Sequence, residues 1–488
     1  MVGARTFLVS SCSFEPPSRL ASSRNAPDLR VSAAPSGRAK TPSMSVVSSN
    51  LGPLANPSGR DLEMGADAPP VDLGATPGPG WLSSMRRQAP AALGIPAYRR
   101  YLFGSSPLSL GAWMQLVALG YLTLRVTGSP AAVGLVGAAD GIPAIALSLP
   151  AGALADRLSR RRILIGTTTT MSLTALLLAL AASLHRVELP VLVGAAICFG
   201  AADAFDQPTR QALVADLVPA PGLVGAAALT SSVGSVTRIV GPAVAGVLLG
   251  FWGAASCFLA MGISGLPFLW ILARGGWADA GHQTAGGKFR PLAQMLEGLR
   301  FAARHPTVRA ILIASLVLGL LGVGYMPFLP VFAREQLHGG GQVLGLMYSL
   351  GGIGALAGGV LISVTSRRLH PGLMLAAAAP VYAGSLFGLT RASQLLLAVP
   401  CLIGISLGFV AANTAMLATL QTLTPGHMRG RVLSLYTLAF SGAGPLGTLL
   451  YAGLSRAIPL FQAIGVGALV VGAALLWSAT RLGIRSER

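Results

Sequence analysis

Long apolar segments, separated by short stretches that contain Arg, Pro and Gly, make up the chain from Tyr101 onward. A helix needs about 20 residues to cross a hydrocarbon core of about 30 Å. The segments have about this length, and they lack the alternation over about ten residues that is typical of barrel strands. They predict twelve membrane-spanning helices, at residues 103–125, 131–155, 163–184, 189–206, 223–251, 254–273, 310–333, 343–364, 371–390, 394–418, 431–454 and 458–480.

The second half of this pattern repeats the first. A group of residues after the second span recurs 207 positions later, and a Gly-Pro pair of the fifth span recurs 203 positions later. The matching residues are Gly152, Leu154, Ser159, Arg160 and Arg161 with Gly359, Leu361, Ser366, Arg367 and Arg368, and Gly241-Pro242 with Gly444-Pro445. The repeat predicts an all-α polytopic membrane protein with two pseudo-symmetric halves of six helices, as in parallel-repeat transporters.

Five regions follow from the repeat. The halves are residues 97–273 and 307–481, joined by a cytoplasmic loop at 274–306 and followed by a cytoplasmic tail at 482–488. Residues 1–96 are rich in Ser, Pro, Ala, Gly and Arg and have no long apolar run, so we expect them to be disordered. Two interpretations of them stay open: a tail or early start, with Met44, Met64 or Met85 as the true start, and an organelle transit peptide in a eukaryotic source.

Composition and charge agree with a membrane protein. The chain of 488 residues is 53% hydrophobic and 10% charged, whereas soluble domains carry about 25% charged residues. The net charge of +19 does not indicate a nucleic-acid partner, because the basic residues are scattered between apolar runs. From residue 99 onward, twenty basic residues lie in even-numbered loops and at the ends, against five in odd-numbered loops. The positive-inside rule therefore puts both termini in the cytoplasm, in an inner (cytoplasmic) membrane, or in an organelle envelope in a eukaryotic source.

The loop after the second span carries a motif. It reads Gly152-Ala-Leu-Ala-Asp156-Arg157-Leu-Ser-Arg160-Arg161 and resembles the loop 2–3 signature of the major facilitator superfamily, with Ser159 where the family usually has Gly. Gly lets helices approach closely, and a carboxylate stabilises a helix N-terminus or an Arg. We expect Gly152, Asp156, Arg157, Arg160 and Arg161 to form a gate at the cytoplasmic face; a positive-inside loop alone would account for the arginines.

A second motif lies in the fifth span. The run Arg238-Ile-Val-Gly241-Pro242-Ala-Val-Ala-Gly246 resembles the antiporter signature of the same superfamily, with Thr237 and Ala245 replacing two of its glycines. We expect Gly241, Pro242 and Gly246 to bend the helix and allow tight packing. An ordinary Gly/Pro kink is the alternative interpretation.

Three further segments narrow the resemblance. Residues 111–118, 205–219 and 428–436 are similar to the transmembrane secretion effector branch of the superfamily, which includes the enterobactin exporter, and the similarity covers about residues 97–480. The resemblance implies proton-coupled export of small amphipathic compounds, siderophores or drug-like molecules. The implied partners are the lipid bilayer, a small-molecule substrate and protons, with the proton gradient as the energy source, no cofactor and a monomeric chain.

A few charged residues fall inside the predicted spans. Inserting each charged side chain into the membrane costs about 2.5–3.5 kcal/mol on insertion scales. Asp140 is the proton-carrier candidate, with a hydrogen-bonded packing role as the alternative. Arg238 is expected to contact an anionic substrate group, to modulate a proton site, or to form a structural ion pair. Asp203 and Asp206 are expected to latch the cytoplasmic end against Arg157, Arg160 or Arg210. Whether Asp140 and Arg238 meet stays open.

Polar and aromatic residues in the spans suggest a lining for a cavity. The candidates, for which core packing or an interfacial belt is the alternative, are Gln115, Asn413, Trp113, Tyr121 and Tyr325. An importer of a small metabolite with the same fold is the second functional hypothesis. A membrane-embedded enzyme or scaffold is the third, and it is disfavoured because the sequence has no HExxH, GxSxG or Walker A motif and no metal-ligand spacing.

Overall fold

The computed structural model describes residues 92–155, 158–274, 291–365 and 369–483, and in this part it is helical throughout, with short turns. Within these residues, twelve helical segments are long and apolar enough to cross a membrane, which confirms the predicted number of spans. In the first half they are α2 (Pro96–Thr127), α3 (Pro130–Ala155), α4 (Arg160–Ser183), α5 (Leu189–Leu217), α6 (Leu223–Phe251), and α7 (Ala254–Ser264) continued by α8 (Leu266–Arg274).

The second half begins after α9 (Pro291–Arg304), a helix that does not span. Its seventh span runs from Pro306 to Gln336 and is built from α10 (Pro306–Val317), η2 (Leu318–Val323), η3 (Met326–Phe328), α11 (Leu329–Val331) and η4 (Phe332–Gln336). The remaining spans are α12 (Gly341–Thr365), α13 (Pro371–Leu389), α14 (Leu395–Leu423), α15 (Gly426–Ser441) continued by α16 (Ala443–Leu454), and α17 (Leu460–Gly483).

The ends of the helices carry ordinary signals. Pro96 and Pro371 occupy the first turns of α2 and α13, where a missing N–H costs nothing. Gly128 closes α2 with φ +62°, the left-handed conformation that glycine adopts freely. The side chain of Ser159 caps α4 by accepting from the backbone N–H of Arg162. Residues 92–93 are helical and lead through a turn at 94–95 into α2, with Ala92 buried, so this part of the predicted disordered region is ordered. Residues 1–91 lie outside the described residues.

The fourth span differs most from its expected bounds. Hydropathy ends it at residue 206, whereas α5 continues to Leu217. The helix continues because Asp206 pairs with Arg210 one turn later, and their charges are satisfied on the helix itself. The eleventh span begins at Gly426 rather than 431 and is interrupted at Gly442.

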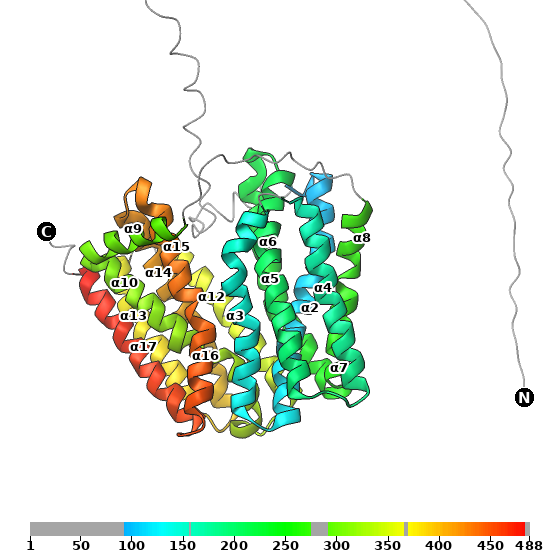
Figure 1. The fold of residues 1–488 in the computed structure, drawn as a ribbon. Helices are drawn as coiled ribbons and strands as arrows, with labels where there is room; N and C mark the ends of the chain where they lie inside the picture. Colours follow the sequence, from blue (N-terminus) through cyan, green and yellow to red (C-terminus); the bar gives the residue numbers. More distant parts are fainter. Residues whose placement is uncertain (1–91, 156–157, 275–290, 366–368, 484–488) are drawn as a thin grey trace, which may run out of the picture. The chain divides into compact units, whose positions relative to one another are not determined.

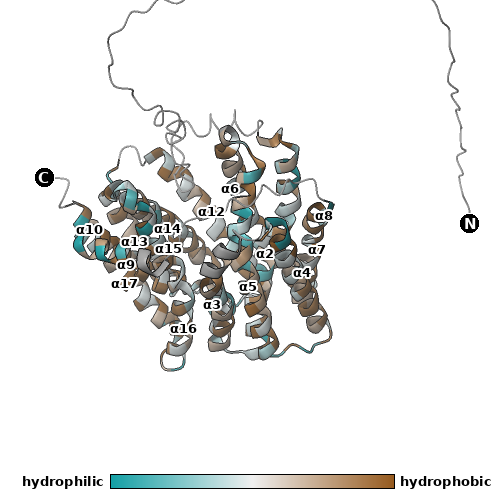
Figure 2. Ribbon diagram, turned by 45° about the horizontal axis from the view of Figure 1, so that its top comes forward, coloured by the Kyte–Doolittle hydropathy of each residue, from teal (hydrophilic) through white to brown (hydrophobic). Residues whose placement is uncertain are grey.

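Helices pack mainly within each half. In the first half α5 packs against α3 and α4, and α2 packs against α6 and α7; in the second half α13 packs against α14 and α17. Two pairs make the most extensive contacts between the halves: α6 with α12, and α3 with α16, which are the fifth span with the eighth and the second with the eleventh (Figure 1). Smaller contacts join α2 to α11 and α12, and α3 to η3. The ribbon is mostly hydrophobic along the spans, with hydrophilic residues around α9 and α10 (Figure 2).

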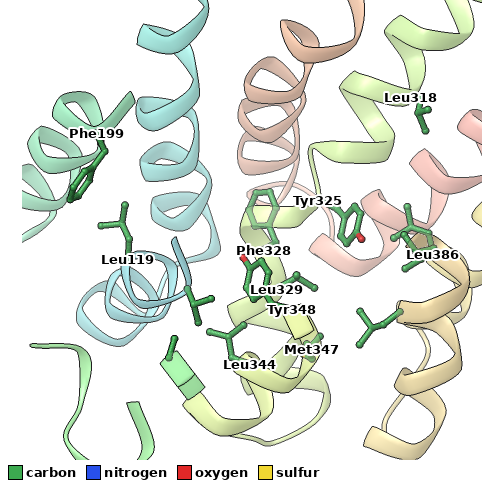
Figure 3. Packing of buried hydrophobic residues seen from close by; sticks show 14 of the residues in the cluster. Leu119, Phe199, Leu318, Tyr325, Phe328, Leu329, Leu344, Met347, Tyr348 and Leu386 are labelled. Atoms are coloured by element: carbon green, nitrogen blue, oxygen red, sulfur yellow. The ribbon is translucent and has the colours of Figure 1, made fainter. Parts of the chain in front are cut away.

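The seventh span is irregular, and its buried residues form much of the core near the join between the halves. Phe328 is fully buried, and Leu344, Met347 and Tyr348 of α12 pack nearby (Figure 3). Tyr348 donates a hydrogen bond to the carbonyl of Met326 at 3.2 Å. An interrupted helix is tolerated at membrane depth only where protein groups satisfy its backbone, and the tertiary contacts of this span supply such groups.

Candidate functional site

The charged side chain of Arg238 faces the interior between the two halves. At about 100° per residue, Val240 lies about 200° from Arg238 around α6, and Val236 and Val247 lie on the same side as Val240. These three valines are exposed and apolar, which marks the lipid side of the helix. Arg238 is also exposed but points the opposite way, and its guanidinium lies 5.3 Å from the ring centroid of Trp113 on α2. The stacked cation therefore lies on the side of the first-half helices that faces away from lipid, toward the other half, which we call the inner surface.

Asp203 of α5 has the same orientation. The exposed positions Val191, Gly194 and Ile197 lie about 120–180° away from it around the helix and form the lipid side. Asp203 is itself exposed, as is Gln207 one turn later. An exposed carboxylate on the side opposite the lipid face points to the interior, where water reaches it.

Asp140 of α3 lies next to Asp203. The exposed residues Leu135 and Ile142 mark the lipid side of α3, about 140–160° from Asp140. The two helices meet closely, because Gly200, one turn before Asp203, packs directly on the backbone carbonyl of Asp140. The inner surface of the first half thus carries a pair of acidic groups.

These three charges share one level of the membrane. Counted from the end where α3 and α5 begin and α6 ends, Asp140, Asp203 and Arg238 lie about 15, 21 and 20 Å along their helices at 1.5 Å per residue. Within the described residues, the ion pairs are Arg160–Asp216, Asp206–Arg210 and Glu297–Arg431. Asp140 and Arg238 therefore do not pair with each other in this arrangement, and Arg238 is held by the ring of Trp113.

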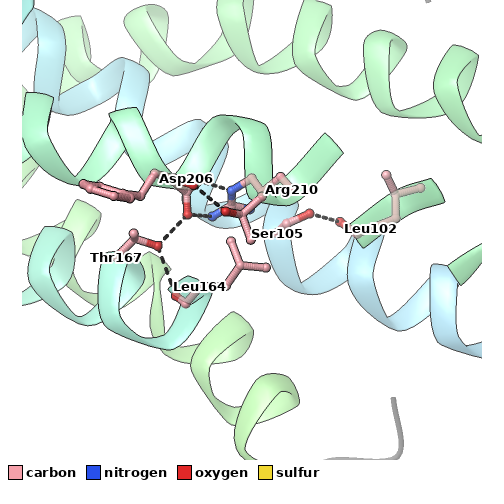
Figure 4. Close-up of polar contacts among 8 residues, drawn as sticks. Leu102, Ser105, Leu164, Thr167, Asp206 and Arg210 are labelled. Carbon is pink, nitrogen blue, oxygen red and sulfur yellow. Dashed lines mark hydrogen bonds and ion pairs between the residues drawn. The ribbon is translucent and has the colours of Figure 1, made fainter. Parts of the chain in front are cut away.

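Asp206 and Arg210 form a closed polar cluster inside the first half. Both oxygens of the Asp206 carboxylate accept from the Arg210 guanidinium, and Oδ1 also accepts from the hydroxyl of Thr167 on α4 at 2.8 Å (Figure 4). The guanidinium lies 4.6 Å from the ring centroid of Phe268. The structure thus joins Asp206 and Arg210 to each other and to α4 and α8. Asp203, one turn earlier on α5, faces the interior, and its charge lies close enough to interact with those of Asp206 and Arg210.

The arginines of the loop 2–3 motif hold the ends of neighbouring helices. Arg160 pairs with Asp216 and donates to the carbonyl of Ala212 at 2.8 Å, both on the last turns of α5. Arg161 donates to the carbonyls of Leu272 and Ala273 at the end of α8, at 2.6 and 2.8 Å. A cation at a helix C-terminus stabilises the helix, so these two side chains tie α4 to the fourth and sixth spans.

The remaining motif residues are placed only in part. Gly152 lies in the last turns of α3. Asp156 and Arg157 lie outside the described residues. Asp216 is a partner that the sequence reasoning did not select, although an acidic residue just before Leu217-Val218-Pro219, at a helix end, is a recognisable signal.

We expect the Arg160–Asp216 pair to contribute modestly to stability. The two side chains are 33% and 24% exposed, so solvent screens the pair and its coupling should be at most about 1 kcal/mol. The measurement is a double-mutant cycle of thermal unfolding in detergent with Arg160→Gln, Asp216→Asn and the double variant. Strictly additive effects would show that the pair contributes no coupling.

The residues of the antiporter-like motif make two close contacts. A Cβ atom at Gly241 would stand 2.6 Å from Cβ of Trp113 on α2. A Cβ atom at Gly246 would stand 3.0 Å from Cα of Gly345 on α12, and one at Gly345 would stand 2.5 Å from the carbonyl oxygen of Pro242. Gly241 of the motif therefore packs α6 against α2, and Gly246 packs it against α12 of the other half.

Among the described residues, the closest approaches between the halves lie from the middle of the helices toward one end. We call the end of the helices where α9 lies the α9 end. We call the other end, where α2 ends and α3 begins, the opposite end. The close approaches and hydrogen bonds between the halves run from the middle of the helices to the opposite end. They include Gly134 with Ala452, Gly137 with Pro327, Gly141 with Pro445, Gly246 with Gly345, the Ser349 hydroxyl donating to Ile239 at 2.8 Å, and the Arg334 guanidinium donating to Leu124 at 3.3 Å.

The candidate lining residues have different environments. Tyr121 lines a cavity of about 490 Å³ between the halves near the opposite end, together with Arg125 and Arg334. Gln115 is buried one turn from Gly111, which packs on α7, and Tyr325 is buried in the core. Trp113 and Asn413 are half-buried.

Three side chains that sequence reasoning did not select stabilise the irregular seventh span. Tyr382 of α13 donates to the carbonyl of Gly322, Tyr451 of α16 donates to the carbonyl of Leu321 at 2.9 Å, and Thr448 donates to the carbonyl of Gly324 at 3.2 Å. The wide helical turns of this span leave such carbonyls without an ordinary partner. The only local signal is the spacing of the glycines in this span.

Several known proteins are similar over most of the chain. The Staphyloferrin A transporter of Staphylococcus aureus is 26% identical, over 72% of this chain and 88% of its own length. The multidrug efflux pump Tap of Mycolicibacterium fortuitum is 28% identical (76% and 93%), and the Enterobactin exporter EntS of Escherichia coli is 26% identical (75% and 89%). These relatives are transporters, not enzymes.

Solved structures show the same fold. The nucleoside transporter NupG superposes with a TM-score of 0.67 at 13% identity, covering 80% of this chain and 99% of its own. A bacterial homologue of the iron transporter ferroportin in the inward-facing state gives 0.62 at 17% identity, covering 80% and 99%. The profile of the transmembrane secretion effectors matches residues 89–487. The chain therefore belongs to the transmembrane secretion effector family of major facilitator transporters.

Proposed function

We propose that this chain is a proton-coupled exporter of small amphipathic compounds and that it works by alternating access. The observation that supports this most is the inner surface of the first half, where Asp140, Asp203 and Arg238 all point away from lipid at one membrane level. Charges inside a membrane are costly and are retained for substrate or ion movement. Efflux pumps and siderophore transporters among the relatives agree with export.

The two kinds of charge suggest separate tasks. Asp140 and Asp203 both face the interior on helices that meet closely at Gly200, so the inner surface offers two neighbouring carboxyl groups that can bind and release a proton. Arg238 has no carboxylate partner among the described residues and presents its guanidinium beside an aromatic ring. This arrangement suits a substrate that has an anionic group next to an apolar or aromatic body.

The join between the halves supports alternating access. With the α9 end in the cytoplasm, as the distribution of basic residues favours, the described arrangement corresponds to an inward-facing state, closed at the opposite end. Substrate would enter from the cytoplasm and leave after the halves part at the opposite end and meet at the α9 end. The path lies within one chain, so a monomer is sufficient.

The function is tested in inverted membrane vesicles that contain this chain. We expect a dye such as ethidium or Hoechst, or a siderophore, to accumulate when a proton gradient is imposed, and the accumulation to collapse when a protonophore is added. Vesicles without the chain are the control. Accumulation that persists without the proton gradient would contradict proton coupling. Movement of the substrate out of the inverted vesicles, rather than into them, would favour an importer.

Replacing Arg238 should discriminate between substrates. We expect Arg238→Gln to reduce transport of an anionic amphipathic probe by about 10- to 100-fold, because a hydrogen bond to a charged group contributes about 1.5–3 kcal/mol. Transport of a neutral probe should change little, and Arg238→Lys should keep part of the anionic transport. Initial rates with both probes in the same vesicles provide the measurement. An equal loss for both probes would indicate a structural role for Arg238.

A further inference from the structure

The helix α9 has three different faces. Gly298 and Ala302 are buried, and α9 packs through this face against α15 and α10. At about 100° per residue a second face carries Glu297, Arg300 and Arg304, all exposed. The third face carries Met295, Leu296 and Leu299, which are 37%, 48% and 47% exposed. Large apolar side chains on a short polar-faced helix are unfavourable in water and typical of a helix at a membrane surface.

The position of α9 agrees with the membrane–water interface. The helix ends at Arg304, and the seventh span begins two residues later at Pro306. It is fixed to the body by the ion pair between Glu297 and Arg431 of α15 and by close packing of Gly298 on Leu435. Figure 1 shows α9 across the ends of the spans of the second half rather than along them.

Other residues mark the interface at the same end. Trp477 of α17 is exposed and has the guanidinium of Arg481 5.9 Å from its ring, and α17 packs on α10. Trp270 of α8 is also exposed, with Arg274 at 3.9 Å. Exposed Trp beside Arg at the ends of spans is the usual composition of the interfacial belt.

We propose that α9 binds the surface of a bilayer that contains anionic phospholipid. Met295, Leu296 and Leu299 insert at the boundary between headgroups and chains, while Arg300 and Arg304, with the exposed Arg309 one turn into α10, contact the phosphate groups. Three arginines around an apolar face complement a negative surface. This binding holds α9, which lies between the two halves in the sequence, at the membrane surface. It does not depend on which substrate is carried.

The insertion of the apolar face is tested with a reporter. Leu296→Trp is reconstituted in nanodiscs of phosphatidylcholine and phosphatidylglycerol, and the added fluorescence is taken as the difference from the parent. We expect phospholipid brominated on its chains to quench this added fluorescence and aqueous iodide to leave it nearly unchanged. Leu446→Trp, at an exposed apolar position of α16, is the lipid-side control. Quenching by iodide, or by neither quencher, would overturn the proposal, the latter because protein then covers the face.

The charge requirement is tested separately. Native mass spectrometry measures how much phosphatidylglycerol and phosphatidylcholine the purified chain retains. We expect Arg300→Gln/Arg304→Gln/Arg309→Gln to retain phosphatidylglycerol about tenfold less or lower still, because each basic residue near an anionic surface contributes about 1 kcal/mol. The matched control is Arg125→Gln/Arg391→Gln/Arg456→Gln, three exposed arginines at the opposite end. Equal losses in both triple variants, or no loss in the first, would overturn the assignment.

Discussion

Asp140→Asn should abolish transport driven by a proton gradient while the protein still inserts and folds. Asn has nearly the same shape, and within the described residues the Asp140 carboxyl has no hydrogen bond or ion pair to lose. The substitution removes the ability to bind and release a proton at this point of the inner surface. We therefore expect accumulation to fall to the level of vesicles without the chain, whereas exchange of labelled for unlabelled substrate without a gradient should continue.

The informative comparison is Asp206→Asn. Asp206 is buried and bonded to Arg210 and Thr167, so its replacement leaves a buried cation without its partner, which costs about 3–5 kcal/mol in soluble proteins. We expect this variant to lose thermal stability in detergent, and Asp140→Asn to keep it. Normal gradient-driven accumulation by Asp140→Asn would exclude Asp140 as the coupling residue and make Asp203, its neighbour, the next candidate.

Gly246→Val should prevent the halves from meeting as they do here. A Cβ atom at this position would stand 3.0 Å from Cα of Gly345 and 3.1 Å from the carbonyl oxygen of Gly341, both backbone atoms that no side-chain rotation can move away. Overpacking of this kind typically costs about 1–3 kcal/mol. We expect the transport rate to fall roughly tenfold or more, because the state closed at the opposite end becomes less populated.

Two glycines of the same helices provide matched controls. Gly234 of α6 and Gly359 of α12 have no atom within 4 Å of a Cβ built on them. Gly234→Val and Gly359→Val should therefore transport at nearly the parent rate. Equal losses in all three variants would show that valine itself disturbs the helices, and full activity of Gly246→Val would show that this crossing is not needed for transport.

The sequence predicts the spans well because a bilayer imposes a simple requirement of length and apolarity. It fails where polar groups are satisfied by partners elsewhere. Hydropathy ends the fourth span at Asp206, yet the pairing of Asp206 with Arg210 lets α5 continue to Leu217. The interruptions of the seventh span depend on Tyr382 and Tyr451, which lie 60 and 130 residues away from the carbonyls they bind. No local pattern predicts such distant donors.

For the candidate site, the sequence predicts which residues matter but not how they are arranged. A charge within an apolar run is conspicuous, so Asp140 and Arg238 could be selected from the sequence alone. Their relation could not, because it depends on the rotation of α3, α5 and α6 about their axes. The structure brings Asp140 to Asp203 through the close contact of Gly200, and turns Arg238 toward Trp113 instead.

The crossing of α6 and α12 has an energetic consequence for the transport cycle. At the level of Gly246 the contact is made by the backbone of Pro242, Gly246 and Gly345, whereas on either side of it Leu249 packs on Gly341 and Ile239 packs on Gly352. Separating two large apolar side chains into water costs about 1.5–3 kcal/mol for each, whereas parting these glycines exposes little apolar area. This glycine part of the crossing therefore adds little to the free-energy difference between the two states, which the binding energy of a substrate or a proton must offset to shift their populations.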